Sequence, residues 1–273
     1  MFDYHVHSLF SADSKMKLAE ACEAAIEAGV KEIAFTEHID YFYPNCDLIF
    51  DFDYQEYAKA IDQVQEQYLN KLKILKAVEI GIHPFKHKEN SMFAKANDFD
   101  FIIGSVHLAD DLDLHNGDYF KGKSLDEALE TYFLTINQYV KEFADFNVLG
   151  HLTLIKRYLH YVKAYWADVQ WKNYYDIIEN TFKILIESER GIEVNMSGFR
   201  YRIDCALPDL PFLKLYKDVG GEIITVGTDA HSKHFVGKHL EFGYQLLEQA
   251  GFKYVTTFRQ RKPTFVSLSG ILK

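Results

Sequence analysis

The chain of 273 residues is long enough for one large α/β domain or for two smaller domains. Its 40 Asp and Glu residues outnumber its 30 Lys and Arg residues, and the formal charge of −10 argues against a surface that binds nucleic acid by neutralising phosphates. The three cysteines include no Cys-x-x-Cys pair, which excludes a zinc ribbon and a disulfide framework. The sequence shows neither a signal peptide nor an apolar stretch that could span a bilayer, so we expect a cytoplasmic enzyme that binds no membrane.

Short apolar runs typical of buried β-strands alternate along the chain with segments of helical spacing. We expect strands at 2–7, 32–36, 74–78, 100–106, 147–150, 191–194 and 222–226, with a weaker candidate at 254–258. We expect helices between an N-cap at Ser14 and a stop at Gly29, and then at about 57–68, 88–97, 124–143, 171–188, 208–219 and 236–250. Because the chain has no internal repeat and no Pro-, Gly- or Ser-rich linker, we expect a single domain over residues 1–273.

Alternating strands and helices predict a parallel sheet with crossover helices, either an open sheet or a closed barrel. The expected strands end at polar residues, namely His7, His38, Glu79, His107, His151 and the pair Asp229 and His231. In a barrel all these ends face one mouth, whereas an open sheet would spread them along an edge. With no Gly-x-Gly-x-x-Gly after a strand, the pattern favours an α/β fold of the distorted (β/α)7 TIM-like barrel type, with a metal centre at the C-terminal mouth of the strands.

Nine side chains near these strand ends are candidate metal ligands: His5, His7, Asp13, His38, Glu79, His107, His151, Asp229 and His231. Imidazoles and carboxylates without thiolates suit Zn, Mn or Fe, and nine ligands are enough for two to three divalent ions. Two ions about 3.5–4 Å apart can activate water at neutral pH, and they can stabilise both the attacking and the leaving oxygen of a phosphoryl transfer. Any one of these histidines alone could be structural, but their placement at successive strand ends favours a shared site.

The order of these motifs resembles the PHP (polymerase and histidinol phosphatase) superfamily over essentially the whole chain. The shared motifs are His5-x-His7, Thr36-Glu37-His38, Glu79, Ser105-Val106-His107, Gly150-His151 and Gly227-Thr228-Asp229-Ala230-His231. The resemblance implies a (β/α)7 barrel with three metal ions at its mouth. By motif, the three ligand groups would be His5, His7, Glu79 and Asp229; Glu79, His107 and His151; and Asp13, His38 and His231. Some relatives have His at the position of Asp13.

The details resemble the histidinol-phosphatase branch of this superfamily. The matching stretches are Phe10–Ser14, Phe35–His38, Val78–Gly81 and Asn195–Arg200. Arg157 and Arg200 match positions where that branch has phosphate-binding arginines, in keeping with the planar fork that a guanidinium offers to phosphate. His83 stands where many members have an Asp, and we expect it to contact substrate. His115 and His160 are further candidates for the substrate pocket.

The resemblance implies a metal-dependent phosphate monoester hydrolase, with L-histidinol phosphate, an intermediate of histidine biosynthesis, as the small phosphorylated substrate. The expected reaction is in-line attack by a metal-bridging hydroxide, with Glu79, Asp229 and His231 as catalytic residues. One alternative is a phosphodiesterase or nucleotidase of the same fold that acts on another small metabolite. Another is a metal-binding protein without turnover. The sequence does not indicate the oligomeric state.

Overall fold

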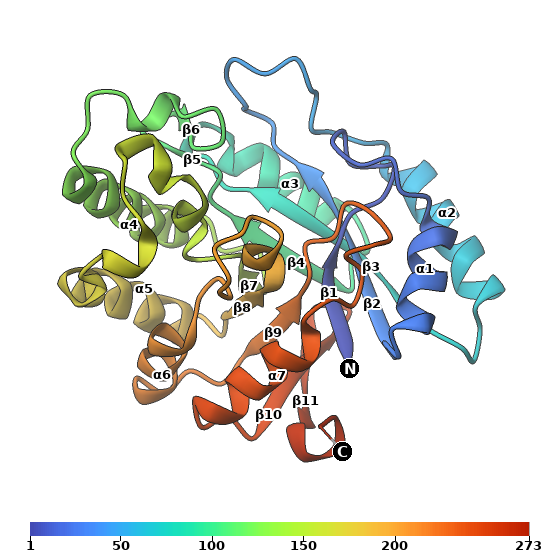
Figure 1. The fold of residues 1–273 in the computed structure, drawn as a ribbon. Coiled ribbons are helices and arrows are strands. Elements are labelled where there is room, and N and C mark those ends of the chain that lie inside the picture. Colours follow the sequence, from blue (N-terminus) through green and yellow to red (C-terminus); the bar gives the residue numbers. More distant parts are fainter. Residues whose placement is uncertain (273) are drawn as a thin grey trace.

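Seven parallel strands form the centre of the computed structural model, which describes residues 1–272. They adjoin one another in the order β1 (Phe2–Val6), β2 (Glu32–Ile39), β3 (Lys73–Gly81), β4 (Phe101–Ser105), β7 (Val148–Leu149), β8 (Gly191–Asn195) and β9 (Ile224–Gly227). A small hairpin of β5 (Leu108–Ala109) and β6 (Leu112–Asp113) follows β4. The seven strands occur where the sequence predicts them, and the (β/α)7 architecture is confirmed (Figure 1).

The sheet curves until the segment that follows β9 meets β1. Val6 bridges Ala230 in parallel register, and the His7 amide donates to the Ala230 carbonyl at 2.9 Å. The Asp229 amide donates to the His5 carbonyl at 2.7 Å. These bonds bring the last strand beside the first and nearly close the barrel, so that all seven C-terminal strand ends face one mouth.

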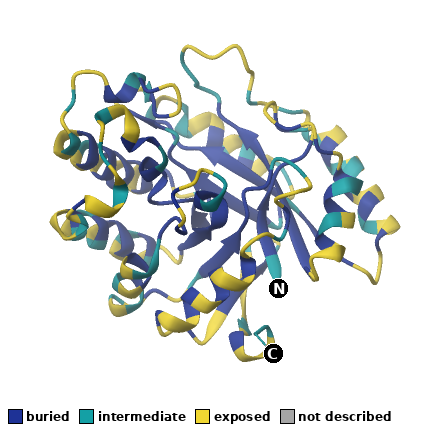
Figure 2. Ribbon diagram, in the orientation of Figure 1, coloured by how far each residue is buried: buried dark blue, intermediate teal, exposed yellow. Residues whose placement is uncertain are grey.

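Helices cover the outer face of the barrel, with α1 and α2 on one side and α4, α5 and α6 on the other (Figure 1). Their bounds are α1 (Leu18–Glu27), α2 (Tyr54–Gln67), α3 (His87–Ala96), α4 (Leu125–Glu142), α5 (Tyr175–Glu187), α6 (Leu210–Asp218) and α7 (Leu240–Gln249). Figure 2 shows buried strands and helices whose exposed residues face outward. In each helix the apolar residues recur every three or four positions, so they form one face that is buried against the sheet.

Two helix starts differ from the sequence-based prediction. The first helix begins at Leu18, and its N-cap is Lys17, whose amide donates to Glu20 at 2.9 Å, rather than Ser14. The helix expected from residue 208 begins at Leu210. Both shifts are small, as expected where several polar residues compete to cap the first turn.

The inside of the barrel is apolar at its N-terminal end and polar at its mouth. Along β3, Leu75, Ala77 and Glu79 share the inner face because side chains two apart on a strand point the same way. The apolar layer is a separate buried cluster that consists of Tyr4, Ala34, Leu75, Ala77, Phe101, Ile103, Val148 and Phe258. The strands therefore bring apolar side chains to the base of the barrel and ionisable side chains to its mouth.

The candidate strand at 254–258 exists, but it does not join the barrel. β10 (Tyr254–Arg259) pairs antiparallel with β11 (Lys262–Ser267) as a separate two-stranded sheet. Phe258 from this hairpin packs against Phe101, with ring centroids 5.0 Å apart, and its amide donates to the Tyr4 hydroxyl at 2.9 Å. The hairpin thereby covers the N-terminal end of the barrel.

Two expectations concern the chain as a whole. Within residues 1–272, no helix combines the length and the apolar character that a membrane crossing needs. That residues 1–273 form a single domain stays a prediction.

Candidate metal centre

All nine predicted ligands lie at the mouth of the barrel. His5 lies in β1 and His7 directly follows it, and both reach the interior because side chains two apart along a strand point the same way. β2 and β3 extend past the predicted ends, so His38 and Glu79 lie within the strands. The remaining ligands follow strand ends or lie in a loop: Asp13, His107, His151, Asp229 and His231.

Glu79 lies at the centre of this cluster. Its Oε2 atom is 3.2 Å from His5 Nε2, 3.4 Å from His7 Nε2 and 3.1 Å from His38 Nδ1. Its Oε1 atom is 3.3 Å from His107 Nε2 and 2.9 Å from His151 Nε2. One carboxylate thus faces two groups of imidazoles, one through each oxygen, which is the geometry of a bridging ligand.

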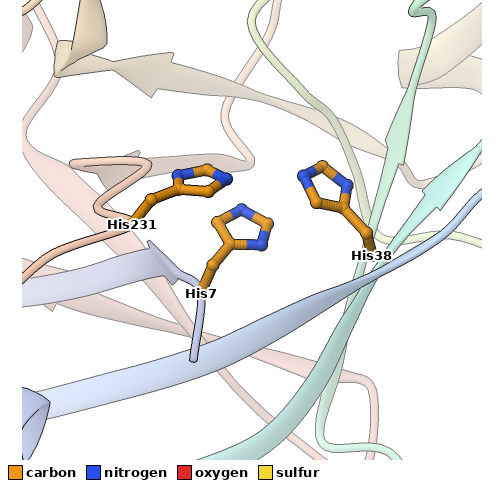
Figure 3. A group of neighbouring side chains, drawn as sticks. All are labelled: His7, His38 and His231. Carbon is orange, nitrogen blue, oxygen red and sulfur yellow. The ribbon is translucent and has the colours of Figure 1, made fainter. Parts of the chain in front are cut away.

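A second part of the cluster surrounds Asp13 and Asp229. His231 Nε2 lies 3.0 Å from Asp13 Oδ2, and His231 Nδ1 lies 3.4 Å from Asp229 Oδ1. His38 Nε2 is 3.7 Å from Asp13 Oδ2, so this ring faces both Glu79 and Asp13. The ring of His7 stacks between those of His38 and His231, with centroids 4.3 and 4.1 Å away (Figure 3).

The cluster fits divalent cations. The buried atoms His7 Nε2 and His38 Nδ1 lie near Glu79 Oε2, but neither forms a hydrogen bond with any group of residues 1–272, an arrangement that is costly unless a ligand completes it. Three sets of donor atoms lie close enough to share an ion: His7, His38 and His231; His5, His7 and Asp229; and His38, Glu79 and His107. Imidazole and carboxylate donors without thiolate are the set that Zn, Mn and Fe accept.

The charges of the cluster compensate one another. Burial raises the pKa of the Glu79 carboxyl, but the facing His5 and His38 outweigh it and hold the pKa well below its usual range. Burial lowers the pKa of His38, but Glu79, Asp40 and Asp13 raise it to about 9. A metal ion and a proton bind the same imidazole nitrogen, so metal binding at His38 would displace a proton from this ring.

Two carboxylates that the sequence analysis missed contact the candidate ligand histidines on the side away from Glu79. Glu193 Oε1 lies 2.6 Å from His5 Nδ1, and Glu193 Oε2 accepts from the His151 amide at 3.0 Å. Asp40 Oδ1 lies 3.0 Å from His107 Nδ1. Such partners fix the tautomer and the orientation of a ligating imidazole. The strand alternation could have indicated Glu193, because it lies between the outward-facing residues Ile192 and Val194.

Glycine is required where the backbone passes close to these side chains. A Cβ atom at position 227 would collide with His5 Cβ and Glu193 Oε1, and one at position 81 would collide with the Asp40 carboxylate. Gly81 and Gly227 therefore leave the space in which the imidazoles and their carboxylate partners pack.

Arg157 and Arg200 both reach Asp229 at the edge of the cluster. Arg157 Nη2 donates to Asp229 Oδ2 at 2.7 Å and to Ser197 Oγ, and its guanidinium lies over the Tyr201 ring, 4.3 Å from the centroid. Arg200 Nη1 donates to the Asp229 carbonyl at 2.6 Å. Burial raises the pKa of Asp229, but the two guanidinium groups hold it well below its usual range. The mouth therefore carries two fixed cations beside the candidate metal ligands.

A cavity of about 360 Å³ lies over the cluster. Its lining includes Asp13, Glu79, both arginines and His231, together with Tyr43, Phe50, Asp113 and Tyr158. His115 lines the cavity as predicted, whereas His160 is not among its lining residues. This volume suits a small metabolite.

His83 does not lie in the cavity lining. Its ring stacks on Phe42, with centroids 4.3 Å apart, and its Nε2 atom lies 2.8 Å from Asp111 Oδ1. The structure directs this side chain toward Asp111 although it follows Glu79 closely in sequence. The position of His83 therefore gives no support to its predicted contact with substrate.

Comparison with known proteins shows the family of the chain. The model of a family described as PHP domain matches residues 3–197. The chain belongs to the PHP family. The histidinol-phosphatase of Lactococcus lactis subsp. lactis is 32% identical over 262 residues, which are 95% of each protein, and this places the chain in the histidinol-phosphatase branch.

Solved structures confirm the fold. A crystal structure of histidinol phosphate phosphatase from Lactococcus lactis subsp. lactis, complexed with zinc, L-histidinol and phosphate, matches with a TM-score of 0.88 and 30% identity. The match covers 96% of this chain and 98% of that one. A crystal structure of a Listeria monocytogenes protein matches with a TM-score of 0.76 at 15% identity, and it supports the barrel fold alone.

Proposed function

We propose that this PHP-family chain hydrolyses a small phosphate monoester, with L-histidinol phosphate as its substrate. The observation that carries the proposal is the Glu79 carboxylate, which faces five imidazoles beside Arg157 and Arg200 in one cavity. The relative of known structure, which holds zinc, L-histidinol and phosphate, supports this choice of substrate.

The ligand groups that we propose follow the two oxygens of Glu79. One group consists of His5, His7, Glu79 and Asp229, and a second consists of Glu79, His107 and His151. The third group consists of Asp13, His38 and His231. We propose two to three divalent ions, with zinc favoured by the relative and Mn or Fe compatible with the same donors.

Bound divalent ions supply Lewis-acid activation of water and neutralise phosphate charge. Arg157 and Arg200 would position the phosphate group. Their guanidinium groups offer planar pairs of donors to the equatorial phosphate oxygens, which carry most of the charge during transfer. Asp229 holds both arginines in place. His231 is 23% exposed and lies between Asp13 and Asp229 at the edge of the cluster. Glu79, Asp229 and His231 remain the proposed catalytic residues.

A substrate panel with metal-loaded protein tests this function. We expect kcat/KM for L-histidinol phosphate to exceed that for p-nitrophenyl phosphate, nucleoside monophosphates and bis-phosphorylated nucleotides by about 10²-fold or more, because only the first combines a phosphate with an ammonium group. Folded Asp229→Asn and His107→Ala variants should be inactive. Preference for the nucleotides would favour the phosphodiesterase or nucleotidase alternative, and absence of turnover with bound metal would favour a metal-binding protein.

One statement about partners and one about location stay predictions. The acidic charge predicts that the chain does not bind nucleic acid. The cytoplasmic location that the sequence predicts is likewise untested by the fold.

A further inference from the structure

Asp113 is a buried carboxylate in the wall of the cavity, away from the metal ligands. It ends the small hairpin that follows His107, and it is 4% exposed. Its Oδ1 atom accepts from the His115 amide at 2.7 Å and from the Tyr43 hydroxyl at 3.0 Å, and its Oδ2 atom accepts from the Asn116 amide at 3.3 Å. These bonds fix the carboxylate in one orientation.

Asp113 differs from the other buried carboxylates of the cavity in its partners. Asp40 faces His107, Glu79 faces imidazoles and Asp229 faces Arg157. The three groups that bond Asp113 are all neutral, and within residues 1–272 no Lys, Arg or His side chain forms an ion pair with it. A buried carboxylate without a cation is costly, and a positively charged ligand would offset that cost.

The substrate class of the proposed function carries such a charge. L-Histidinol phosphate has a phosphate at one end and an ammonium group that is charged at neutral pH, whereas its imidazole has an ordinary pKa of about 6.5 and is mostly neutral there. The guanidinium groups of Arg157 and Arg200 line the cavity, and Asp113 belongs to the same lining. Phenyl rings of Phe50 and Tyr158 add flat apolar surface beside them.

We propose that Asp113 is a specificity-determining residue that binds the ammonium group of the substrate while the arginines bind its phosphate. This inference rests on the proposed function and extends it to the part of the substrate that does not react. Tyr43, from the loop between β2 and α2, donates to the carboxylate and keeps it turned to the cavity. Burial, together with the nearby Asp113 and Asp40, raises the pKa of Tyr43, so its hydroxyl stays a neutral donor.

The test compares two substrates in the metal-loaded Asp113→Asn variant. Asn keeps an oxygen for the Tyr43 and His115 donors but removes the charge. We expect kcat/KM for L-histidinol phosphate to fall by about 10–100-fold, mainly through KM, and that for p-nitrophenyl phosphate, which has no ammonium, to stay within about twofold. Asp110→Asn is the matched control, because Asp110 lies in the same hairpin but is exposed and pairs with Lys123, and it should change neither value.

Equal losses with both substrates would show a structural role for Asp113, and unchanged values with both would show no role; either result overturns the proposal. A second readout is inhibition of p-nitrophenyl phosphate hydrolysis. The inhibition constant of L-histidinol should rise about tenfold or more in Asp113→Asn, whereas those of inorganic phosphate and of 4-(hydroxymethyl)imidazole, which lacks the amine, should stay unchanged. A rise for 4-(hydroxymethyl)imidazole would overturn the assignment to the ammonium.

These readouts also separate this inference from the proposed function. If the wild-type protein does not hydrolyse L-histidinol phosphate, the proposed function fails. The inhibition constants, which need only hydrolysis of p-nitrophenyl phosphate, still report whether Asp113 recognises an amine.

Discussion

The two ends of the barrel are lined by inward-facing side chains of the same strands. They differ in whether their buried polar groups have hydrogen-bond partners. At the base, apolar residues such as Leu75 and Phe101 fill the interior, and the hydroxyl of Tyr4 both donates to Glu32 and accepts from the Phe258 amide. At the mouth, the buried atoms His7 Nε2 and His38 Nδ1 approach Glu79 Oε2 but form no hydrogen bond with any of the described residues.

This difference indicates that the base of the barrel serves the stability of the fold and that the mouth serves its function. The base is a satisfied, packed layer of the kind that contributes to folding, and β10 and β11 cover it. The mouth concentrates carboxylates and imidazoles that burial alone would disfavour, and it becomes favourable when cations and substrate occupy it. Changes at the mouth should therefore alter metal content and activity, and changes at the base should alter the free energy of unfolding.

The largest expected effect is at Glu79. Glu79→Gln removes the charge that both imidazole groups face, so we expect kcat/KM for L-histidinol phosphate to fall by at least about 10³-fold, together with the metal content. Phosphate release and elemental analysis on the same sample measure both. Circular dichroism should show an intact fold, and activity within tenfold of the wild type would contradict the bridging role.

At the base, Phe258→Ala should lower the free energy of unfolding by about 3–5 kcal/mol, because this side chain is 2% exposed and closes the apolar layer. Denaturant unfolding measures the change, and kcat/KM of the folded, metal-loaded protein should stay the same. Phe265→Ala, on the same hairpin but 46% exposed, is the control and should change stability by less than about 0.5 kcal/mol. A loss of activity without a loss of stability would break the separation between the two ends.

Arg200→Lys should act on substrate and leave the metal content unchanged. A lysine keeps the charge but loses the planar pair of donors, so we expect a fall in kcat/KM of about 10–100-fold, chiefly through KM. Arg202→Lys in the neighbouring exposed loop is the control and should have no effect. Metal loss in Arg200→Lys would indicate that the arginine supports the ligands, against its proposed contact with phosphate.

The smallest effect is expected at Glu193, which orients His5 and the backbone of His151. Glu193→Gln should weaken metal affinity by about tenfold, as measured by competition with a chelator, and excess metal should restore activity. Glu189→Gln, at the exposed end of the preceding helix, should leave the affinity unchanged. Irreversible loss of activity at saturating metal would assign Glu193 a different role.

The barrel and the clustering of the candidate ligands could be predicted because most of these residues stand at strand ends and parallel strands bring their ends together; that they bind metal stays a prediction. Asp40 was missed because it stands next to a loop rich in aromatic and acidic residues, where nothing distinguishes it from a solvated side chain. The partner of β10 was missed because β11 is almost wholly exposed and carries no apolar alternation. His83 follows Glu79 closely in sequence, but only the tertiary structure reveals its partner Asp111.

The central claim, a metal-dependent phosphatase centre at the mouth, is tested most directly by one paired measurement. Release of inorganic phosphate from L-histidinol phosphate is compared between metal-loaded and chelator-treated protein, with the metal content determined on the same samples. We predict two to three divalent ions per chain, loss of activity on chelation and recovery when zinc or manganese is returned. Undiminished phosphate release from metal-free protein, or a chain that neither binds metal nor releases phosphate, would contradict the account.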